Sequence, residues 1–463
     1  MLTREENEYF TRVGPGTPGG EWLRRYWHPV YPAALLLENP VRKVRILCED
    51  LVLFRDRSGA LGLVQERCPH RQTSLSCGIP EIRGLRCCYH GWLFSSDGEC
   101  LEQPLEPAGS TFKDKIRIKA YPVQEMGGLI WAYLGPQPAP LLPRWDLFVR
   151  PDGFRQILAH QLPCNWLQVM ENRSDAAHLS YLHGRWFQYA LERQGRLTAD
   201  PKARYNQTMA EMDAMRARGA HPKLGANPHE FGFTKAILPS DASEEQPAWS
   251  LGNAPWVFPY MLLRGPGESA VRLRRFYQLG VPIDDTHTWH LQYNCYVFPE
   301  AVQAPRQDVA SYVELPLKDE NGEYTLDHAV AQDVVAWTEQ GPINDRTQEH
   351  LGASDVLVVK FRRLLKEQIE RVRRNEDPMG VFRDPALIDS PEQRIPGNEK
   401  VFSASHSAKD ISNYYPEDLH KLSPGGGLYI EDEVDKYSPD REVLLELFRR
   451  AEKVLAKDQT PGG

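Results

Sequence analysis

The sequence predicts an α+β protein with two principal domains: a small all-β domain near the N-terminus, and a larger domain in which helices flank an antiparallel sheet. Three observations support this fold class. Short apolar runs separated by Gly, Asp and Pro fill residues 41–140, as in an all-β domain. Longer segments with alternating apolar and polar residues lie between 256 and 299, and segments with helical periodicity surround them. The 463 residues, 41% of them hydrophobic, are enough for a large core.

In chain order the sequence divides into four parts. These are an N-terminal helical segment at 1–40, the all-β domain at 41–140, the larger domain at 141–375 with an irregular insertion at 187–250, and a C-terminal extension at 376–463. A G-x-G-x-x-G pattern at residues 14–19 matches dinucleotide-binding loops, but a polar segment precedes it instead of a strand. We therefore interpret it as a loop before a helix near residues 21–26.

The larger domain and the extension contain the remaining expected elements. Strands are expected at residues 256–265, 270–283 and 288–299, and helices at 166–183, 208–218, 327–340 and 354–375. The extension ends in a predicted helix with Ser438 as N-cap and Pro439 at the first position. The apolar face of this helix consists of Leu444, Leu447, Phe448, Ala451 and Leu455. That face needs a surface to pack against, on the same subunit or on another one.

Composition excludes several classes of function. A formal charge of −8 argues against a nucleic-acid-binding protein and favours small-molecule partners. No uncharged apolar run approaches the length of a membrane span, and the first residues do not follow the signal-peptide pattern, so we expect a cytoplasmic protein. Eight cysteines are too few for a disulfide scaffold in a chain of this length. Five of them are expected to be buried thiols: Cys48, Cys77, Cys100, Cys164 and Cys295.

The other cysteines lie in a cluster of metal-ligand residues. Cys68 and His70 form one pair, and Cys87 and His90 form a second pair after a stretch long enough for a hairpin. Zinc sites usually keep like ligands together, whereas here each pair mixes a thiolate with an imidazole. Mixed pairs are typical of a Rieske-type [2Fe–2S] cluster, in which two thiolates bind one iron and two imidazoles bind the other. The second thiolate is assigned to Cys87, with Cys88 as the alternative.

A second group of polar residues lies in the predicted helix at 166–183. Asn172, Asp175, His178 and His183 have the spacing N-x₂-D-x₂-H-x₄-H. On a helix Asp175 and His178 share a face, and His183 can join them if the helix bends or ends near residue 181. Two histidines and one carboxylate leave open positions on a mononuclear Fe(II), as binding of O₂ beside a substrate requires.

Together these motifs make the chain resemble the oxygenase (alpha) component of Rieske non-haem iron aromatic oxygenases. The resemblance rests on CPH…CCYHGW and NRSDAAHLSYLH, and it extends over nearly the whole chain. It implies a catalytic domain of the helix-grip, START-like type, with Cys68, His70, Cys87 and His90 as cluster ligands. It also implies that His178, His183 and a distant Asp bind the mononuclear iron. Asp333 best fits that position; the alternatives are Asp327, Asp345 and Asp355.

The family resemblance also implies partners and an electron path. Electrons from NAD(P)H would arrive through a separate reductase, with or without a ferredoxin, and O₂ would be the co-substrate. Asp175 would be a catalytic residue that connects a Rieske histidine of one subunit to His178 of its neighbour, in a homotrimer; Asn172 is the second candidate catalytic residue. A carrier of electrons with a degenerate second site is the alternative that lacks catalysis.

A narrower resemblance concerns the branch and the substrate. Segments such as GSTFKDKIRIKAYPV and QGPINDRTQEHLGASD resemble the phthalate-dioxygenase branch, and GSTFKDK, LPRWDLFV and CNWLQVMEN resemble O-demethylases of lignin-derived biaryls such as 5,5′-dehydrodivanillate. The sequence departs from the usual pattern at Ala176-Ala177, where a Pro-containing pair is expected. Ring cis-dihydroxylation or hydroxylation is the alternative reaction. An aromatic acid would need a guanidinium partner. The candidates are Arg185, Arg264, Arg272, Arg274 and Arg275.

Overall fold

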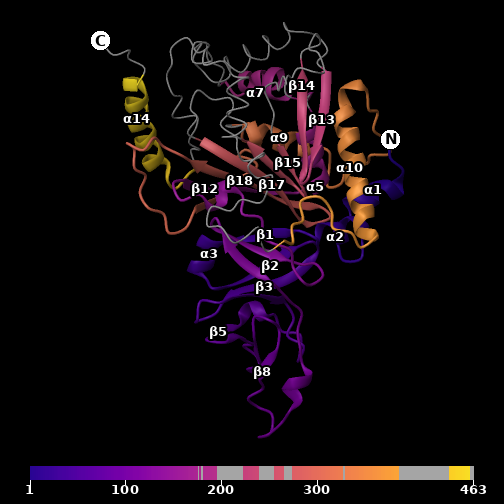
Figure 1. The fold of residues 1–463 in the computed structure, drawn as a ribbon, viewed down its shortest axis with the longest axis vertical. Helices are drawn as coiled ribbons and strands as arrows, with labels where there is room; N and C mark the ends of the chain where they lie inside the picture. Colours follow the sequence, from indigo (N-terminus) through magenta and orange to yellow (C-terminus); the bar gives the residue numbers. More distant parts are fainter. Residues whose placement is uncertain are drawn as a thin grey trace.

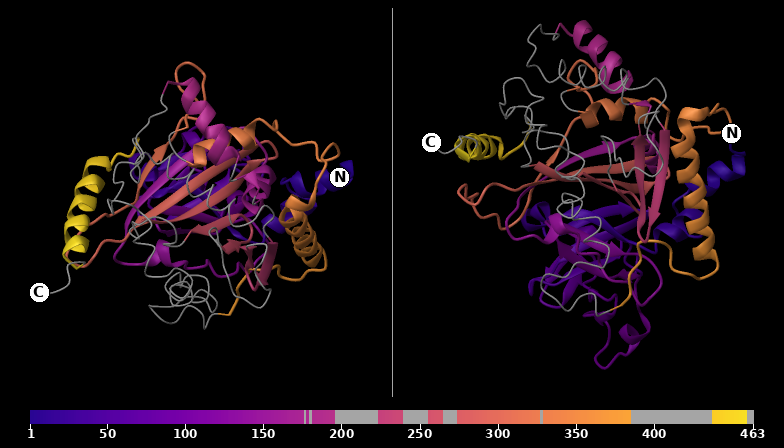
Figure 2. Two further views of the ribbon diagram at one scale, coloured as in Figure 1. Left: turned by 90° about the horizontal axis from the view of Figure 1, so that it is seen from above. Right: turned by 45° about the horizontal axis from the view of Figure 1, so that its top comes forward.

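The computed structural model describes residues 1–175, 177–178, 181–195, 223–238, 255–264, 274–326, 329–384 and 437–458. Figure 1 shows a small β domain, with β5 and β8, at one end of the molecule and a large sheet with its helices at the other. Helices α10 and α14 flank opposite sides of this sheet, and the two further views in Figure 2 agree. In the described part of the chain, no helix is both long and apolar enough to cross a membrane.

The small domain contains two four-stranded antiparallel sheets. The first consists of β2 (Val41–Ile46), β3 (Glu49–Arg55), β4 (Leu61–Gln65) and β9 (Ala120–Tyr121). The second consists of β5 (Ile79–Glu81), β6 (Gly84–Arg86), β7 (Leu93–Phe94) and β8 (Cys100–Glu102). Short 3₁₀ turns at Leu75–Cys77 and Phe112–Lys115 connect them. Phe54, Leu85 and Phe94 are fully buried in a core of their own, together with Cys68 and Cys87.

The first 40 residues contain a strand as well as helices, whereas only a helical segment was expected. They form α1 (Arg4–Thr11), α2 (Pro18–Leu23), β1 (Trp27–Pro32) and α3 (Ala33–Glu38). Strand β1 pairs with β11 (Leu129–Tyr133), which also pairs with β10 (Val123–Met126) in a three-stranded sheet. The prediction missed β1 because its two prolines are unfavourable in strands, yet β11 supplies the pairing. The glycine pattern at 14–19 follows α1 and includes the first two residues of α2, so a helix and not a strand precedes it.

The large domain is built on an eight-stranded sheet in the order β13-β14-β15-β16-β17-β18-β12-β19. All neighbours are antiparallel except β12 and β19. The strands are β12 (Phe154–Leu162), β13 (Lys223–His229), β14 (Gly232–Leu238), β15 (Pro255–Val257), β16 (Met261–Arg264), β17 (Arg274–Asp284), β18 (His287–Tyr296) and β19 (Ser311–Glu314). The helices are α4 (Asp146–Val149), α5 (Trp166–Ser174), α7 (Phe187–Arg193), α9 (Ala329–Thr338) and α10 (Val356–Arg373). A 3₁₀ turn at Ala353–Asp355 precedes α10.

The prediction of an irregular insertion at 187–250 is wrong for the part that the structure describes. This part contains α7 and the hairpin of β13 and β14, which joins the sheet through the pairing of β14 with β15. The β13 sequence KLGANPH has weak strand propensity, so pairing along the sheet outweighs the local preference. The helix expected at 208–218 lies outside the described residues.

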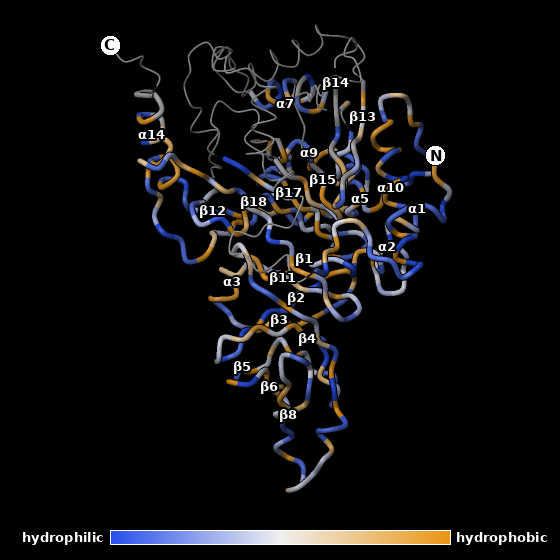
Figure 3. Tube along the Cα trace, in the orientation of Figure 1, coloured by the Kyte–Doolittle hydropathy of each residue, from blue (hydrophilic) through white to orange (hydrophobic). Residues whose placement is uncertain are grey.

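The C-terminal helix α14 (Arg441–Asp458) begins two residues later than expected, after a turn that Ser438 stabilises. The Ser438 hydroxyl accepts a hydrogen bond from the Asp440 amide (3.1 Å) and also contacts Gln156 of β12. The buried face of α14 packs against its own chain, at the ends of β12 and β18. Its contact residues are Leu444, Leu447, Phe448 and Ala451; Leu455 lies outside the residues whose side chains are described. Figure 3 shows hydrophobic and hydrophilic residues along both α14 and α10, as expected for helices with one buried face.

A buried charge network connects α5 to α10. The Glu171 carboxylate accepts hydrogen bonds from Arg346 (2.7 to 3.0 Å) and from Arg362 (2.6 Å), and Arg362 also binds Glu349. The Glu171, Arg346 and Arg362 side chains are 8%, 0% and 7% exposed. Burial would raise the pKa of Glu171, but the two guanidinium groups outweigh it and lower the pKa. The network therefore fixes the position of α5, the helix that leads to Asp175, His178 and His183.

Replacing Glu171 with Gln is expected to lower the free energy of unfolding by about 3–5 kcal/mol, because two buried guanidinium groups lose their anion. The measurement is the thermal midpoint under matched conditions. The control is Glu8→Gln, which removes an exposed pair with Arg4 (52% and 89% exposed) and should cost less than about 1 kcal/mol. Equal midpoints for the two variants would contradict a stabilising role of the network.

Candidate metal centres

Two loops of the small domain have the same backbone structure. One begins at Cys68, after β4, and the other at Cys87, between β6 and β7. In each loop the cysteine carbonyl accepts a hydrogen bond from the amide four residues on, at Gln72 (2.9 Å) or Gly91 (3.1 Å), and the cysteine amide donates to the carbonyl five residues on. Gln72 and Gly91 both have a left-handed conformation (φ 62° and 76°). By this correspondence Cys87, and not Cys88, is the counterpart of Cys68.

Burial distinguishes the two neighbouring cysteines further. Cys68 and Cys87 are 1% and 3% exposed, whereas Cys88 is exposed. Burial raises the pKa of Cys68 to about 11. The Cys87 thiol also raises this pKa, and local backbone hydrogen bonds lower it in part. Two buried sulfur atoms, one from each loop, fit a metal cluster that binds thiolates.

The two imidazoles of these loops lie next to each other. The ring centroids of His70 and His90 are 4.4 Å apart, and the His70 ring stacks on Trp92 (4.6 Å, 6°). His70 is exposed and His90 is half-buried. A cluster held here would have thiolates on the inside and imidazoles towards the surface. This arrangement fits a Rieske-type cluster that passes electrons outwards through a histidine.

The remaining cysteines only partly follow the expectation of buried thiols. Cys100, Cys164 and Cys295 are buried, and burial raises the pKa of Cys164 to about 12. The prediction is wrong for Cys77, which is exposed, and Cys48 is only half-buried. Cys77 ends a 3₁₀ turn at the surface, a placement that the sequence alone did not indicate.

The second centre begins where α5 ends. The predicted helix at 166–183 is interrupted, because α5 stops at Ser174 and Asp175 is extended (ψ 133°). The Asp175 carboxylate accepts hydrogen bonds from the amides of Ala177 (2.7 Å) and His178 (3.1 Å), so it caps the next turn. A π-helical turn at Tyr181–Trp186 then carries His183. This break turns His178 and His183 towards a common point.

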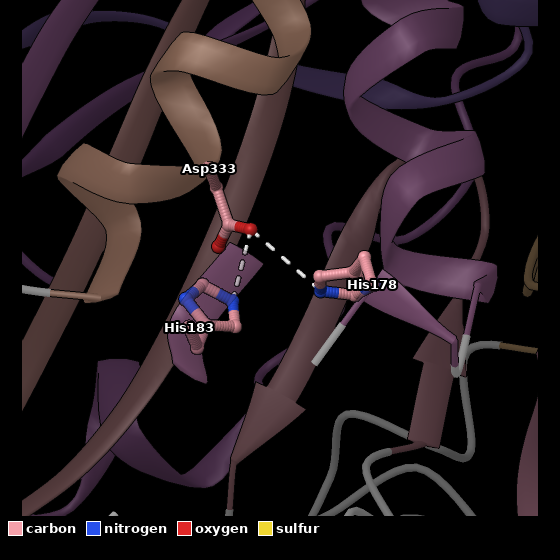
Figure 4. Close-up of side chains that lie close together, drawn as sticks. All are labelled: His178, His183 and Asp333. Carbon is pink, nitrogen blue, oxygen red and sulfur yellow. Dashed lines mark ion pairs between the residues drawn. The ribbon is translucent and has the colours of Figure 1, made fainter. Parts of the chain in front are cut away.

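His178, His183 and Asp333 come together at this point, as Figure 4 shows. One ligand atom of each lies within 4.8 Å of the others. The Asp333 Oδ1 is 3.2 Å from the Nε2 of His183 and 3.7 Å from the Nε2 of His178, and the three side chains are 11–15% exposed. Among the described residues no donor makes a hydrogen bond to this buried Oδ1. Burial would raise the pKa of Asp333, but the imidazoles outweigh it and lower the pKa.

Such a group fits a divalent metal ion, because two imidazole nitrogens and a carboxylate oxygen face the same point. Two histidines and one carboxylate are the ligand set of non-haem Fe(II) enzymes with open positions. Two of the three alternatives to Asp333 lie elsewhere in the structure. Asp345 caps a turn at Thr347, Asp355 accepts a hydrogen bond from the Gly352 amide (2.7 Å), and Asp327 lies outside the described residues.

Two further residues support this centre and were missed from the sequence. The Gln332 Oε1 lies 2.8 Å from the Nδ1 of His183, which leaves the Nε2 of His183 facing Asp333. The ammonium group of Lys235, a buried residue of β14, donates to the carbonyls of Arg173 (2.9 Å) and Asp175 (3.4 Å). Gln332 could have been found as the neighbour of Asp333 in the sequence; Lys235 lies in the segment that was expected to be irregular.

The two predicted catalytic residues lie beside this centre. The Asp175 Oδ2 is 3.5 Å from the Nδ1 of His178, on the side of the imidazole that faces away from Asp333. Burial would raise the pKa of Asp175, but His178 outweighs it and lowers the pKa. Asn172 is half-buried in the last turn of α5, and its carbonyl accepts a hydrogen bond from the Asp175 amide (3.1 Å).

Comparison with known proteins determines the family. The model of the Rieske [2Fe–2S] domain matches residues 26–122, and the model described as LigXa C-terminal domain like matches residues 306–395. The chain is 40% identical over 447 residues to the 5,5′-dehydrodivanillate O-demethylase oxygenase subunit of Sphingobium sp., covering 96% of both chains. The chain belongs to the Rieske oxygenases, as an oxygenase subunit.

Other relatives agree with this membership. This Rieske oxygenase subunit is 34% identical over 415 residues to the phthalate 4,5-dioxygenase oxygenase subunit of Pseudomonas putida, and the match covers 82% of this chain and 89% of the relative. The terminal oxygenase of carbazole 1,9a-dioxygenase from Novosphingobium sp. KA1 has the same fold (TM-score 0.54, 19% identity, 79% of this chain and 95% of that one).

The comparisons confirm the predicted family, fold class and cofactors. This Rieske oxygenase subunit is an enzyme, the terminal oxygenase of a multicomponent system that receives electrons from protein partners. Its chemistry uses a [2Fe–2S] cluster, mononuclear iron and O₂. The electron-carrier alternative is therefore not supported.

The correspondence of the two loops makes a prediction about the neighbouring cysteines. Cys87→Ser is expected to remove the visible absorption of the [2Fe–2S] cluster and its two irons, because the buried thiolate is lost. Cys88→Ser, the matched control, should keep both, since the Cys88 side chain is exposed. The measurement is the absorption spectrum with iron analysis. The reverse pattern would show that Cys88 binds the cluster.

Proposed function

We propose that this oxygenase subunit O-demethylates a methoxylated aromatic acid, specifically a carboxylated biaryl of the lignin-derived class. The observation that carries the proposal is the convergence of His178, His183 and Asp333 on one point in a chain that matches a dehydrodivanillate O-demethylase subunit over nearly its full length. Relatives of this kind support the substrate class, and the geometry supports the oxygen chemistry.

In this proposal each group of side chains has one role. Cys68, His70, Cys87 and His90 hold the [2Fe–2S] cluster, and His178, His183 and Asp333 hold Fe(II). When bound, the iron would supply activation of O₂ beside the substrate. The Gln332 contact orients the His183 ring so that its Nε2 is the nitrogen available for binding. The Lys235 contacts fix the chain between Arg173 and Asp175, and so the position of His178.

The proposed reaction inserts one oxygen atom of O₂ into a C–H bond of the methoxy group. The resulting hemiacetal releases formaldehyde and leaves a phenol; the second oxygen atom becomes water, with two electrons and two protons from outside. The low exposure of the three candidate ligands, 11–15%, keeps most bulk water away from them. Exclusion of water favours oxidation of the bound substrate over side reactions.

Ring hydroxylation is the second candidate function. The match to a phthalate 4,5-dioxygenase subunit favours it, because that relative covers most of the chain at 34% identity. The same three side chains could serve both reactions, so the ligand set does not distinguish them. The products do: O-demethylation releases formaldehyde, whereas cis-dihydroxylation retains both oxygen atoms on the ring.

We also propose that the active assembly is a homotrimer in which Asp175 connects two subunits. In Figure 1 the sheet with β5 and β8, which adjoins the Cys68 and Cys87 loops, lies at one end of the molecule, whereas α9 lies in the large domain. Asp175 is 22% exposed and its carboxylate is close to the Nδ1 of His178. It could thus accept a hydrogen bond from His90 or His70 of a neighbouring subunit and complete the electron path.

The test of the proposed function is product analysis. The holoenzyme with a generic reductase, NADH and O₂ is given a panel of methoxylated aromatic acids and their counterparts without methoxy groups. We expect a product lighter by one CH₂ and one formaldehyde per turnover from the methoxylated acids, measured by mass spectrometry and a formaldehyde assay. Products that carry two added hydroxyl groups on the ring would favour the dioxygenase reaction instead.

The role of Asp175 has a test of its own. Asp175→Asn is expected to keep both metal centres while coupled turnover falls by about 10–100-fold, since the carboxylate no longer links the histidines. Iron content and the cluster spectrum are measured beside turnover. Asp345→Asn, which changes a carboxylate in an exposed turn, is the control and should be nearly normal. Near-normal coupled activity of the Asp175→Asn enzyme would refute the connection.

A further inference from the structure

One face of the central strands is polar, although it lies inside the protein. His290, Gln292 and Asn294 alternate along β18 and are 0%, 8% and 1% exposed, and Gln278 of β17, opposite Gln292, is 9% exposed. The other face of β18 is mostly apolar, with Leu291, Tyr293 and Cys295 fully buried. Buried amides are unfavourable without partners, so this row of polar side chains needs a reason.

The polar face is the one that the metal-site helices cover. The His290 ring lies 5.2 Å from the ring of Trp337, which is one turn after Asp333 on α9. Arg173, two residues before Asp175, lies over the Trp337 ring (5.8 Å) and donates to the Gln278 carbonyl (3.2 Å). The polar row therefore borders the candidate iron site.

Asn294 is the residue of this row with an unmet donor. Its Oδ1 accepts a hydrogen bond from the Nε2 of Gln292 (3.1 Å), which fixes the orientation of the amide. Its Nδ2 is buried and makes no hydrogen bond to any described residue. A buried amide nitrogen without an acceptor is unfavourable. The site thus offers a donor to a ligand with an acceptor oxygen.

A guanidinium group lies on the same face of the sheet as this donor. Phe276 of β17 pairs with Asn294, and the guanidinium carbon of Arg274 lies 5.3 Å from the centre of the Phe276 ring. Since residues two apart on a strand share a face, Arg274 belongs to the same face as Phe276 and Gln278. A neutral amide donor and a cation on one face of the sheet favour an anionic oxygen ligand.

The structure also separates Arg274 from the other arginines considered for a substrate acid. Arg275 pairs with Cys295 and so lies on the opposite face of the sheet. Arg185 is exposed and lies over Tyr181 (5.7 Å). Arg272 and the side chain of Arg264 lie outside what the structure describes.

We infer that Asn294 and Arg274 bind the carboxylate of the aromatic acid and thereby select the substrate. The inference rests on the proposed function, since it takes the acid as the substrate class. The amide nitrogen of Asn294 donates to one carboxylate oxygen, and the guanidinium of Arg274 binds the carboxylate as a counter-ion. Gln278 and Gln292, which lie on the same face, would then border the ring that carries the acid.

The test measures binding to the iron-loaded holoenzyme without turnover. Isothermal titration under anaerobic conditions compares 5,5′-dehydrodivanillate with its dimethyl ester. Asn294→Leu and Arg274→Gln are each expected to raise the Kd of the acid about tenfold or more, which is about 1.4 kcal/mol, and that of the ester less than about twofold. Arg275→Gln, on the opposite face of β17, is the matched control and should change neither value.

Asn294→Asp keeps the size of the side chain and places a negative charge beside the acid. This substitution should weaken binding of the acid most and leave binding of the ester nearly unchanged. The cluster spectrum and the thermal midpoint verify that each variant is folded. Equal losses of affinity for the acid and the ester would overturn the inference. Equal effects of Arg274→Gln and Arg275→Gln on the Kd of the acid would also overturn it. A wild-type enzyme that binds the acid but demethylates no methoxylated compound would instead contradict the proposed function.

Discussion

The large domain depends on placing the carboxylate of Asp333 between two imidazoles in a mostly buried position. A carboxylate in such a place is costly unless a cation or hydrogen-bond donors compensate its charge. The surrounding contacts therefore fix helices α5 and α9 relative to each other. The buried Gln168 of α5 donates to the carbonyls of Trp337 (2.8 Å) and Gly341 (2.9 Å) at the end of α9 and accepts from the Asn344 amide (3.0 Å). One amide side chain thus ties the helix before His178 to the helix that carries Asp333.

The small domain positions its candidate cluster ligands with two loops of the same backbone geometry. Its two cysteine loops have the same pattern of backbone hydrogen bonds, so each presents a buried thiol at its start and an imidazole near its tip. The two thiols lie inside the domain, whereas the two imidazoles lie close to its surface. The domain can therefore hold a cluster firmly on one side and expose it to an electron partner on the other.

Much of this protein could be predicted from residue patterns. The strands at 41–65, strands β17 and β18 and helices α9 and α10 lie where the residue pattern predicts them. The strand expected at 256–265 is instead two short strands, β15 and β16, with a turn between them. The errors share a cause. The strand β1 contains two prolines, and β13 and β14 lie in a polar segment, so local propensity opposes a structure that pairing with distant strands stabilises. Likewise, α5 ends at Ser174 and not near 181, because the Asp175 side chain caps the following turn.

By itself the sequence indicated the chemistry: closely spaced cysteines and histidines, and the D-x₂-H-x₄-H pattern, are local and predict which residues would bind the metals. Only the tertiary structure decided which distant groups meet them. It brought Asp333 and not Asp345 or Asp355 to the histidine pair, set Gln332 and Lys235 behind the site, and turned Asn294 and Arg274 to the same face of the sheet. These relations depend on strand register and helix packing, which arise from contacts between residues far apart in the chain.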